Sequence, residues 1–141
     1  MTDFNLQRFH DAQKYSFQIA LTEIKAGFKR SHWMWYIFPQ IKGLGRSATS
    51  EYYGITCVDE AKAYLEDDVL GTRLREICEE LLNHSDKSAQ DIFGGIDSIK
   101  LKSSMTLFDK VSPNDVFGKV LDAFFEGKHD DYTLVVTDKS I

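Results

Sequence analysis

One stretch of the chain, "KRSHWMWYIFPQIKGLGRS" (Lys29–Ser47), concentrates side chains that can bind a ligand and transfer a proton. His32 is the candidate catalytic residue, because imidazole titrates near neutrality and can donate or accept a proton. Lys29 adds a cation, and Trp33 and Trp35 offer ring faces that can stack on a ligand. The competing interpretation is an aromatic core segment in which His32 makes only structural hydrogen bonds.

The second half of this stretch, "QIKGLGRS", has the composition of a ligand-binding loop. Gly43 and Gly45 permit close approach of backbone amides to a ligand, and Arg46 carries a forked donor suited to phosphate or carboxylate. Ser47 can cap a following helix, whose N-terminus would favour an anion. We therefore predict that Gln40 and this loop contact a ligand. A simple turn is the alternative, since two glycines without a preceding strand do not form a dinucleotide fingerprint.

A third group of polar residues lies in "KLKSSMTLF". On a helix, Lys100, Ser103 and Ser104 share a face opposite Leu101 and its apolar neighbours. Serine and threonine are weak helix formers, so hydroxyls here favour either close helix packing or the lining of a polar pocket. The predicted ligand-binding set, with His32 as the catalytic candidate, is Lys29, Trp33, Trp35, Gln40, Gly43, Gly45, Arg46, Ser47, Lys100, Ser103, Ser104 and Thr106.

Several site classes find no support in the sequence. There is no HExxH, no His/Cys spacing typical of a metal site and no GxSxG, so neither a metal nor a cofactor is expected. Cys57 and Cys78 are too few for a disulfide framework. Carboxylates such as Glu23, Glu51 and Asp97 are plentiful, but the sequence does not tell which of them face one another.

Apolar residues recur at helical spacing along most of the chain, beginning with a stripe over Phe17–Phe28 after a shorter turn around Leu6 and Phe9. The next boundary signals are Gly27 at a helix end, Ser31 and Pro39 around a short helix over His32–Phe38, a capping box at Thr56–Asp59 and a helix junction at Gly71. The later signals are Asp86 or Ser88 before a short helix ending at Gly94, Asp97 or Ser98 and Pro113 around the next, and Asn114 before a helix ending at Gly127. The segment Tyr132–Thr137 reads as extended.

The composition indicates an ordinary globular protein. Its 141 residues are 43% hydrophobic and 28% charged, with a net charge of -5. An acidic balance argues against a nucleic-acid surface, and no apolar run approaches the roughly 18 residues that span a membrane. No secretory signal opens the chain, so we expect a cytoplasmic protein. The expected fold is mainly α: one compact multi-helix domain over residues 1–141, with at most one short extended C-terminal segment.

The motifs quoted above, with "EAKAYLEDDVLGTRLRE" and "IFGGID", resemble the bacterial domain-of-unknown-function family 1810, some members of which carry a calpastatin label. The resemblance runs from Phe4 to Thr133 and implies a mainly helical fold without a settled activity. Phe28 departs from the arginine usual at that position. A weaker similarity, at the level of the fold alone, is to helical N-glycosidases acting on ADP-ribose or related nucleotides.

These observations favour a small-ligand site of nucleotide-like or ADP-ribose-like specificity, with hydrolysis of an N-glycosidic bond as the first reaction to test. The alternative is a non-catalytic protein-interaction module that uses a helix face. The expected partner is a small molecule, not a nucleic acid or a membrane.

Overall fold

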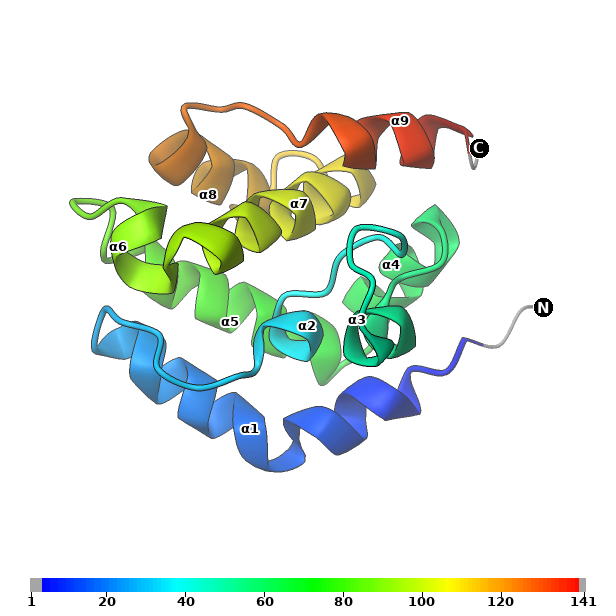
Figure 1. Cartoon of the computed structure of the whole chain (residues 1–141), viewed down its shortest axis with the longest axis horizontal. Coiled ribbons are helices and arrows are strands. Elements are labelled where there is room, and N and C mark those ends of the chain that lie inside the picture. Colours follow the sequence, from blue (N-terminus) through cyan, green and yellow to red (C-terminus); the bar gives the residue numbers. More distant parts are fainter. Residues whose placement is uncertain (1–3, 140–141) are drawn as a thin grey trace.

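In the computed structural model, which describes residues 4–139, this part of the chain folds into nine helices (Figure 1). In chain order they are α1 (Gln7–Lys25), α2 (Met34–Ile37), α3 (Ala48–Tyr53), α4 (Val58–Glu66), α5 (Leu70–Leu82), α6 (Ala89–Phe93), α7 (Gly95–Val111), α8 (Val116–Phe125) and α9 (Asp131–Lys139). Within the described residues the sole strand-like pairing is a parallel bridge between Ile41 and Ile55. The mainly α fold class expected from the sequence is confirmed.

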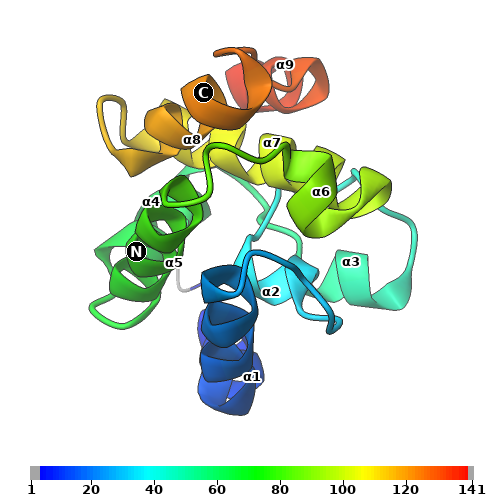
Figure 2. The ribbon, with the colours of Figure 1, turned by 90° about the vertical axis from the view of Figure 1, so that its left-hand side faces the viewer.

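Helices α5 and α7 form the middle of the molecule. Helix α5 contacts α1, α4 and α8, while α7 contacts α4, α6, α8 and α9. Figures 1 and 2 show α1 at one side of this central pair and α8 and α9 at the other. The short helices α2 and α3 contact each other, and α2 also contacts α1.

The core is built from one apolar stripe of each long helix together with the aromatic segment. Phe9 and Ile24 come from α1, Leu74 from α5 and Phe108 from α7, and all four are essentially inaccessible to solvent. Phe108 packs against Phe117 of α8 with ring centroids 5.6 Å apart. Interlocking of such side chains, more than helix propensity, holds helices of this length together.

The aromatic segment forms a shorter helix than the expected His32–Phe38. Helix α2 covers only Met34–Ile37, and Trp33 occupies its N-cap position without a capping side chain. The expectation that Ser31 caps this helix is wrong, because its hydroxyl donates to Glu23 of α1 instead. Met34, Ile37 and Phe38 are buried in the core.

The C-terminal segment differs most from its sequence pattern. Tyr132–Thr137 was expected to be extended, and it is helical, within α9. The Asp130 carboxylate accepts from the amide of Thr133 at 3.0 Å and from its hydroxyl at 2.6 Å, which caps the first turn. Thr133 and Thr137 are buried, and α9 contacts α7, so tertiary contacts override the β-propensity of the Thr-Leu-Val-Val run.

Helix caps were predicted with mixed success. Ser47 accepts from the Ser50 amide at the start of α3, and Ser88 forms a complete capping box with Asp91 at the start of α6. The capping box at Thr56–Asp59 is wrong, because α4 starts at Val58 and the amide and hydroxyl of Thr56 both donate to Glu60. Asn114 is also not the cap of α8; the adjacent Asp115 takes that position.

Other boundaries shift by a few residues. Phe9 belongs to α1 rather than to a separate turn. Helix α1 ends at Lys25, two residues before Gly27, and Phe28 beyond it is 52% exposed instead of continuing the stripe. Gly71 lies in the first turn of α5, where an added Cβ would approach the Leu65 carbonyl to 2.1 Å, so glycine is required for close helix contact. Helix α7 begins at Gly95, ahead of the expected Asp97. None of the helices among residues 4–139 has both the length and the apolar character of a membrane span.

Candidate functional site

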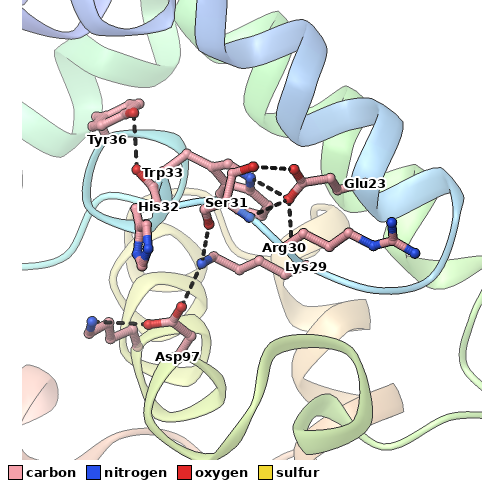
Figure 3. Close-up of polar contacts among 9 residues, drawn as sticks. Glu23, Lys29, Arg30, Ser31, His32, Trp33, Tyr36 and Asp97 are labelled. Carbon is pink, nitrogen blue, oxygen red and sulfur yellow. Dashed lines mark hydrogen bonds and ion pairs between the residues drawn. The ribbon is translucent and has the colours of Figure 1, made fainter.

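The loop between α1 and α2 is fixed in place by the carboxylate of Glu23, near the end of α1 (Figure 3). Glu23 accepts hydrogen bonds from the Arg30 amide (2.7 Å), the Ser31 amide (2.9 Å), the Ser31 hydroxyl and the Trp33 indole N–H (2.9 Å). Burial raises the pKa of this carboxyl, but the four donors outweigh it and lower the pKa to about 2. Glu23 is therefore ionised at neutral pH and holds residues 30–33 in one conformation.

The same loop directs Lys29 toward α7. The Lys29 amide donates to the Ile92 carbonyl of α6 at 2.8 Å, and its ammonium pairs with Asp97 at 2.8 Å (Figure 3). Lys100, one turn along α7, pairs with the other oxygen of the Asp97 carboxylate at 3.0 Å. Burial raises the pKa of Asp97, but the hydrogen bonds and charges of the two lysines lower it by more, so the net shift of the pKa is downward. One carboxylate shared by two ammonium groups leaves a net positive charge at this point.

These residues border a cavity of about 320 Å³ at the junction of the loop, α2, α3 and α7. Its wall contains the ion-paired residues Lys29, Asp97 and Lys100, the exposed His32 and the Trp35 ring. Met34, Tyr36, Ser47 and Thr49 complete the lining. The Tyr36 hydroxyl donates to the His32 carbonyl at 3.2 Å, which fixes the backbone of His32 and leaves its imidazole on the cavity wall. We call this space the polar cavity.

A second cavity, of about 250 Å³, adjoins the polar cavity and shares Trp35 and Lys100 with it. The Lys100 ammonium lies 4.5 Å from the centroid of the Trp35 ring, in a cation–π contact at the boundary of the two spaces. Apolar side chains dominate the rest of the lining, which consists of Gln40, Leu44, Gly45, Ile96, Ile99 and Ser103. We call this space the apolar cavity.

The structure brings eight of the predicted site residues to these two cavities: Lys29, His32, Trp35, Gln40, Gly45, Ser47, Lys100 and Ser103. Gly45 is required there, because an added Cβ would lie 2.8 Å from the Trp35 ring and 2.6 Å from the Ser50 Cβ. The aromatic segment and "KLKSS" thus meet, although they are far apart in sequence.

The other five predicted residues lie elsewhere. Trp33 is 1% exposed and belongs to the core, with its indole N–H donating to Glu23. Ser104 and Thr106 are buried in α7, and the Thr106 hydroxyl donates to the Lys102 carbonyl. Gly43 faces Tyr132 of α9, while Arg46 is exposed and lines neither cavity.

Sequence reasoning did not assign roles to Glu23 and Asp97. Both were visible as carboxylates, but the donors to Glu23 lie 7 to 10 residues away in a loop, and Asp97 pairs with Lys29 of that loop as well as with Lys100 on its own helix. The run of donors in "KRSHW" is the available signal that a carboxylate lies opposite. The described part of the chain contains no cluster of three or more His, Cys, Asp or Glu side chains able to hold a metal ion.

Comparison with known proteins shows the family to which this chain belongs. A family model described as "Protein of unknown function (DUF1810)" matches residues 3–137. The chain belongs to this family. The resemblance found in the sequence is thereby confirmed.

The fold of the family member described here also has a solved counterpart. The crystal structure of the conserved hypothetical protein Rv1873 from Mycobacterium tuberculosis superposes with a TM-score of 0.93 at 40% sequence identity, covering 96% of this chain and 97% of that chain. No curated protein matched the sequence. Neither description names an activity, so the function has to be argued from the two cavities.

Proposed function

We propose that this protein binds a small anionic ligand of the nucleotide class in the polar cavity. The observation that carries the proposal is the pairing of both Lys29 and Lys100 with the single carboxylate of Asp97 on the cavity wall. An ammonium group has three N–H donors, and Lys100 uses one of them on Asp97. Its remaining donors, and the net positive charge, suit a phosphate group.

The Trp35 ring supports a ligand that also carries a ring or a sugar. Trp35 is partly exposed and lines both cavities, whereas its neighbour Trp33 is withdrawn into the core. Ligand pockets span about 300–1,000 Å³. The apolar cavity alone is below this range, and the polar cavity alone is at its lower end. Together they lie inside it. A ligand with an anionic end and a ring fits this arrangement better than a simple anion.

Hydrolysis of an N-glycosidic bond is the reaction that we propose to test in this cavity. Such reactions pass through a transition state with positive charge on the sugar, which a nearby carboxylate stabilises. A bound phosphate would neutralise the excess positive charge of Lys29 and Lys100 and leave the ionised Asp97 carboxylate to act on the sugar, while His32 on the same wall supplies a proton donor or acceptor.

The alternative, a protein-interaction module, is favoured by exposed apolar side chains on helix faces, among them Ile96 and Ile99, which are 75% and 64% exposed on α7. Both residues also line the apolar cavity, where a bound ligand would cover them. We therefore favour ligand binding.

Binding is tested by calorimetric titration with inorganic phosphate, ribose 5-phosphate, adenosine monophosphate and ADP-ribose. We expect saturable binding of the phosphorylated ligands, weakened about tenfold or more in Lys100→Met, because a charge-assisted hydrogen bond contributes about 1.5–3 kcal/mol. Lys62→Met, on the exposed face of α4, is the matched control and should bind normally. Absence of saturable binding to every ligand, or equal binding by Lys100→Met, would contradict the proposal.

Catalysis is tested separately by release of free base from the bound nucleotides, followed by chromatography. We expect release by the native protein, and loss of release in His32→Ala with ligand binding retained, since His32 touches the cavity without holding the fold. Binding without any base release would identify a binding protein and reject the hydrolysis.

A further inference from the structure

We infer that the apolar cavity is a base-binding subsite, and that the base it accepts is adenine, read by the side-chain amide of Gln40. The inference rests on the proposed function, which assigns the polar cavity to the phosphate of the same ligand. It adds a second subsite, a specificity-determining residue and a choice among bases.

The first support is the state of Gln40. This residue lines the apolar cavity, is only 3% exposed, and its amide nitrogen has no hydrogen-bond partner within the part of the chain that the structure describes. A buried polar group without a partner costs free energy, and such groups in native proteins call for an explanation. A ligand atom in the adjoining cavity would supply the missing partner.

The backbone of Gln40 is rigidly held, so the unpaired amide is not a product of a loose loop. The Gln40 carbonyl accepts from the Ile55 amide at 2.8 Å, and the Lys42 amide donates to the Ile55 carbonyl at 2.8 Å. These two bonds flank the parallel bridge between Ile41 and Ile55. Pro39 and Ile41, on either side, are buried. The site is therefore preorganised around the amide, which limits the entropy lost on binding.

The second support is the shape and chemistry of the walls. Trp35 lines the cavity with an aromatic ring, and Leu44, Ile96 and Ile99 add aliphatic surface. Ile96 and Ile99 are three residues apart on α7 and therefore on one side of the helix, both well exposed. A flat heterocycle between Trp35 and these isoleucines would cover their apolar surface.

The choice of adenine follows from the hydrogen-bonding groups present. A glutamine amide offers one donor group and one acceptor side by side, which matches the amino group and adjacent ring nitrogen of adenine. Guanine presents two acceptors at the corresponding edge and is matched by cations. Lys100 is the charged residue in this lining, and the proposed function assigns its ammonium to the phosphate.

The two subsites join in a way that suits a nucleotide. Trp35 and Lys100 are common to both linings, so a ligand that occupies both cavities must cross at this pair. The phosphate would lie on the Lys29 and Lys100 side and the base on the Gln40 side, with the ribose between them. His32 lies on the polar side, near the sugar and phosphate.

The experiment measures dissociation constants for adenosine monophosphate, guanosine monophosphate and ribose 5-phosphate by calorimetry. In the native protein the adenine nucleotide should bind at least tenfold more tightly than either of the other two. Gln40→Leu, which removes the amide and keeps a side chain of similar size, should lower the affinity for adenosine monophosphate to about that for guanosine monophosphate and leave ribose 5-phosphate binding unchanged. Gln18→Leu, on the exposed face of α1, is the control and should retain the full preference.

A second variant protects the test against misfolding of Gln40→Leu. Ile99→Ala changes an exposed side chain and should weaken adenosine monophosphate several-fold without affecting ribose 5-phosphate. Equal affinity for adenosine monophosphate and ribose 5-phosphate in the native protein would overturn this inference and leave the proposed function standing, as would an undiminished adenine preference in both variants. Failure of all three ligands to bind would overturn the inference together with the proposed function.

Discussion

The carboxylate of Glu23 accepts four hydrogen bonds from residues 30–33, including the N–H of the buried Trp33. We predict that Glu23→Gln lowers the free energy of unfolding at pH 7 by about 1–3 kcal/mol, because a charged acceptor is lost and an amide N–H₂ is placed among donors. Glu79→Gln, exposed on α5, is the matched control and should change it little. Urea denaturation measures both, and equal stability of the two variants would contradict the prediction.

The same residue predicts a dependence on acid. Because the folded protein lowers the Glu23 pKa from 4.5 to about 2, the unfolded chain binds the proton more readily. The contribution of the ionised Glu23 carboxylate to the free energy of unfolding is therefore complete above about pH 4.5 and is lost as the pH falls through about 2. Over this window the native protein should lose more stability than Glu23→Gln. Parallel acid titrations of the two by circular dichroism provide the measurement, and coincident pH profiles would refute this assignment.

At this residue scale the sequence pointed to the correct segments but could not sort their members. His32, Trp35 and Lys100 were predicted from side-chain chemistry alone, and all three line the polar cavity. Trp33 was predicted to bind a ligand on the same grounds as Trp35, yet it lies in the core. Trp33 packs against Phe38 and Phe93 while its indole N–H donates to Glu23, and these contacts are not encoded in local spacing.

Among the elements, α9 combines an N-cap with contacts to α7, and together these outweigh the β-propensity of its sequence. The Asp130 carboxylate accepts from the amide and hydroxyl of Thr133, while the Asp130 amide donates to the Thr106 hydroxyl of α7. We predict that Asp130→Ala lowers the free energy of unfolding by about 1 kcal/mol, the usual cost of an N-cap. Hydrogen exchange of residues 131–139 should accelerate as well. The matched control, Asp122→Ala on the exposed face of α8, should leave exchange in α9 unchanged; unaltered exchange in Asp130→Ala would contradict the prediction.

Element boundaries were predictable where a cap has no competitor next to it. Ser47 satisfies that condition and caps α3, whereas at α6 the sequence offers Asp86 or Ser88 and the structure shows Ser88 as the cap. Asn114 has Asp115 beside it, and Ser31 has Glu23 across the fold, so in both cases another contact wins. Helix periodicity therefore predicts the type of most elements, while competition between neighbouring side chains for hydrogen bonds decides where they end.

Across the whole molecule, Arg8 connects α1 to two later segments. Its guanidinium donates to the carbonyls of Tyr52 (2.8 Å) and Gly54 (3.1 Å) and pairs with Glu60 of α4 at 2.7 Å. The side chains of Arg8 and Glu60 are 6% and 2% exposed. No local pattern predicts this contact, because the two residues come from separate helices.

The pair yields a prediction for global stability. Removal of one partner from a buried ion pair costs about 3–5 kcal/mol, since the other charge remains buried without compensation. We expect this loss for Arg8→Met and for Glu60→Gln, and less than the sum of the two for the double variant, because no unpaired charge remains. Removal of the exposed pair Lys128–Glu126, with side chains 71% and 86% exposed, should cost under about 1 kcal/mol. Chemical denaturation of the native protein and these variants provides the measurement, and strictly additive losses would show that Arg8 and Glu60 act independently.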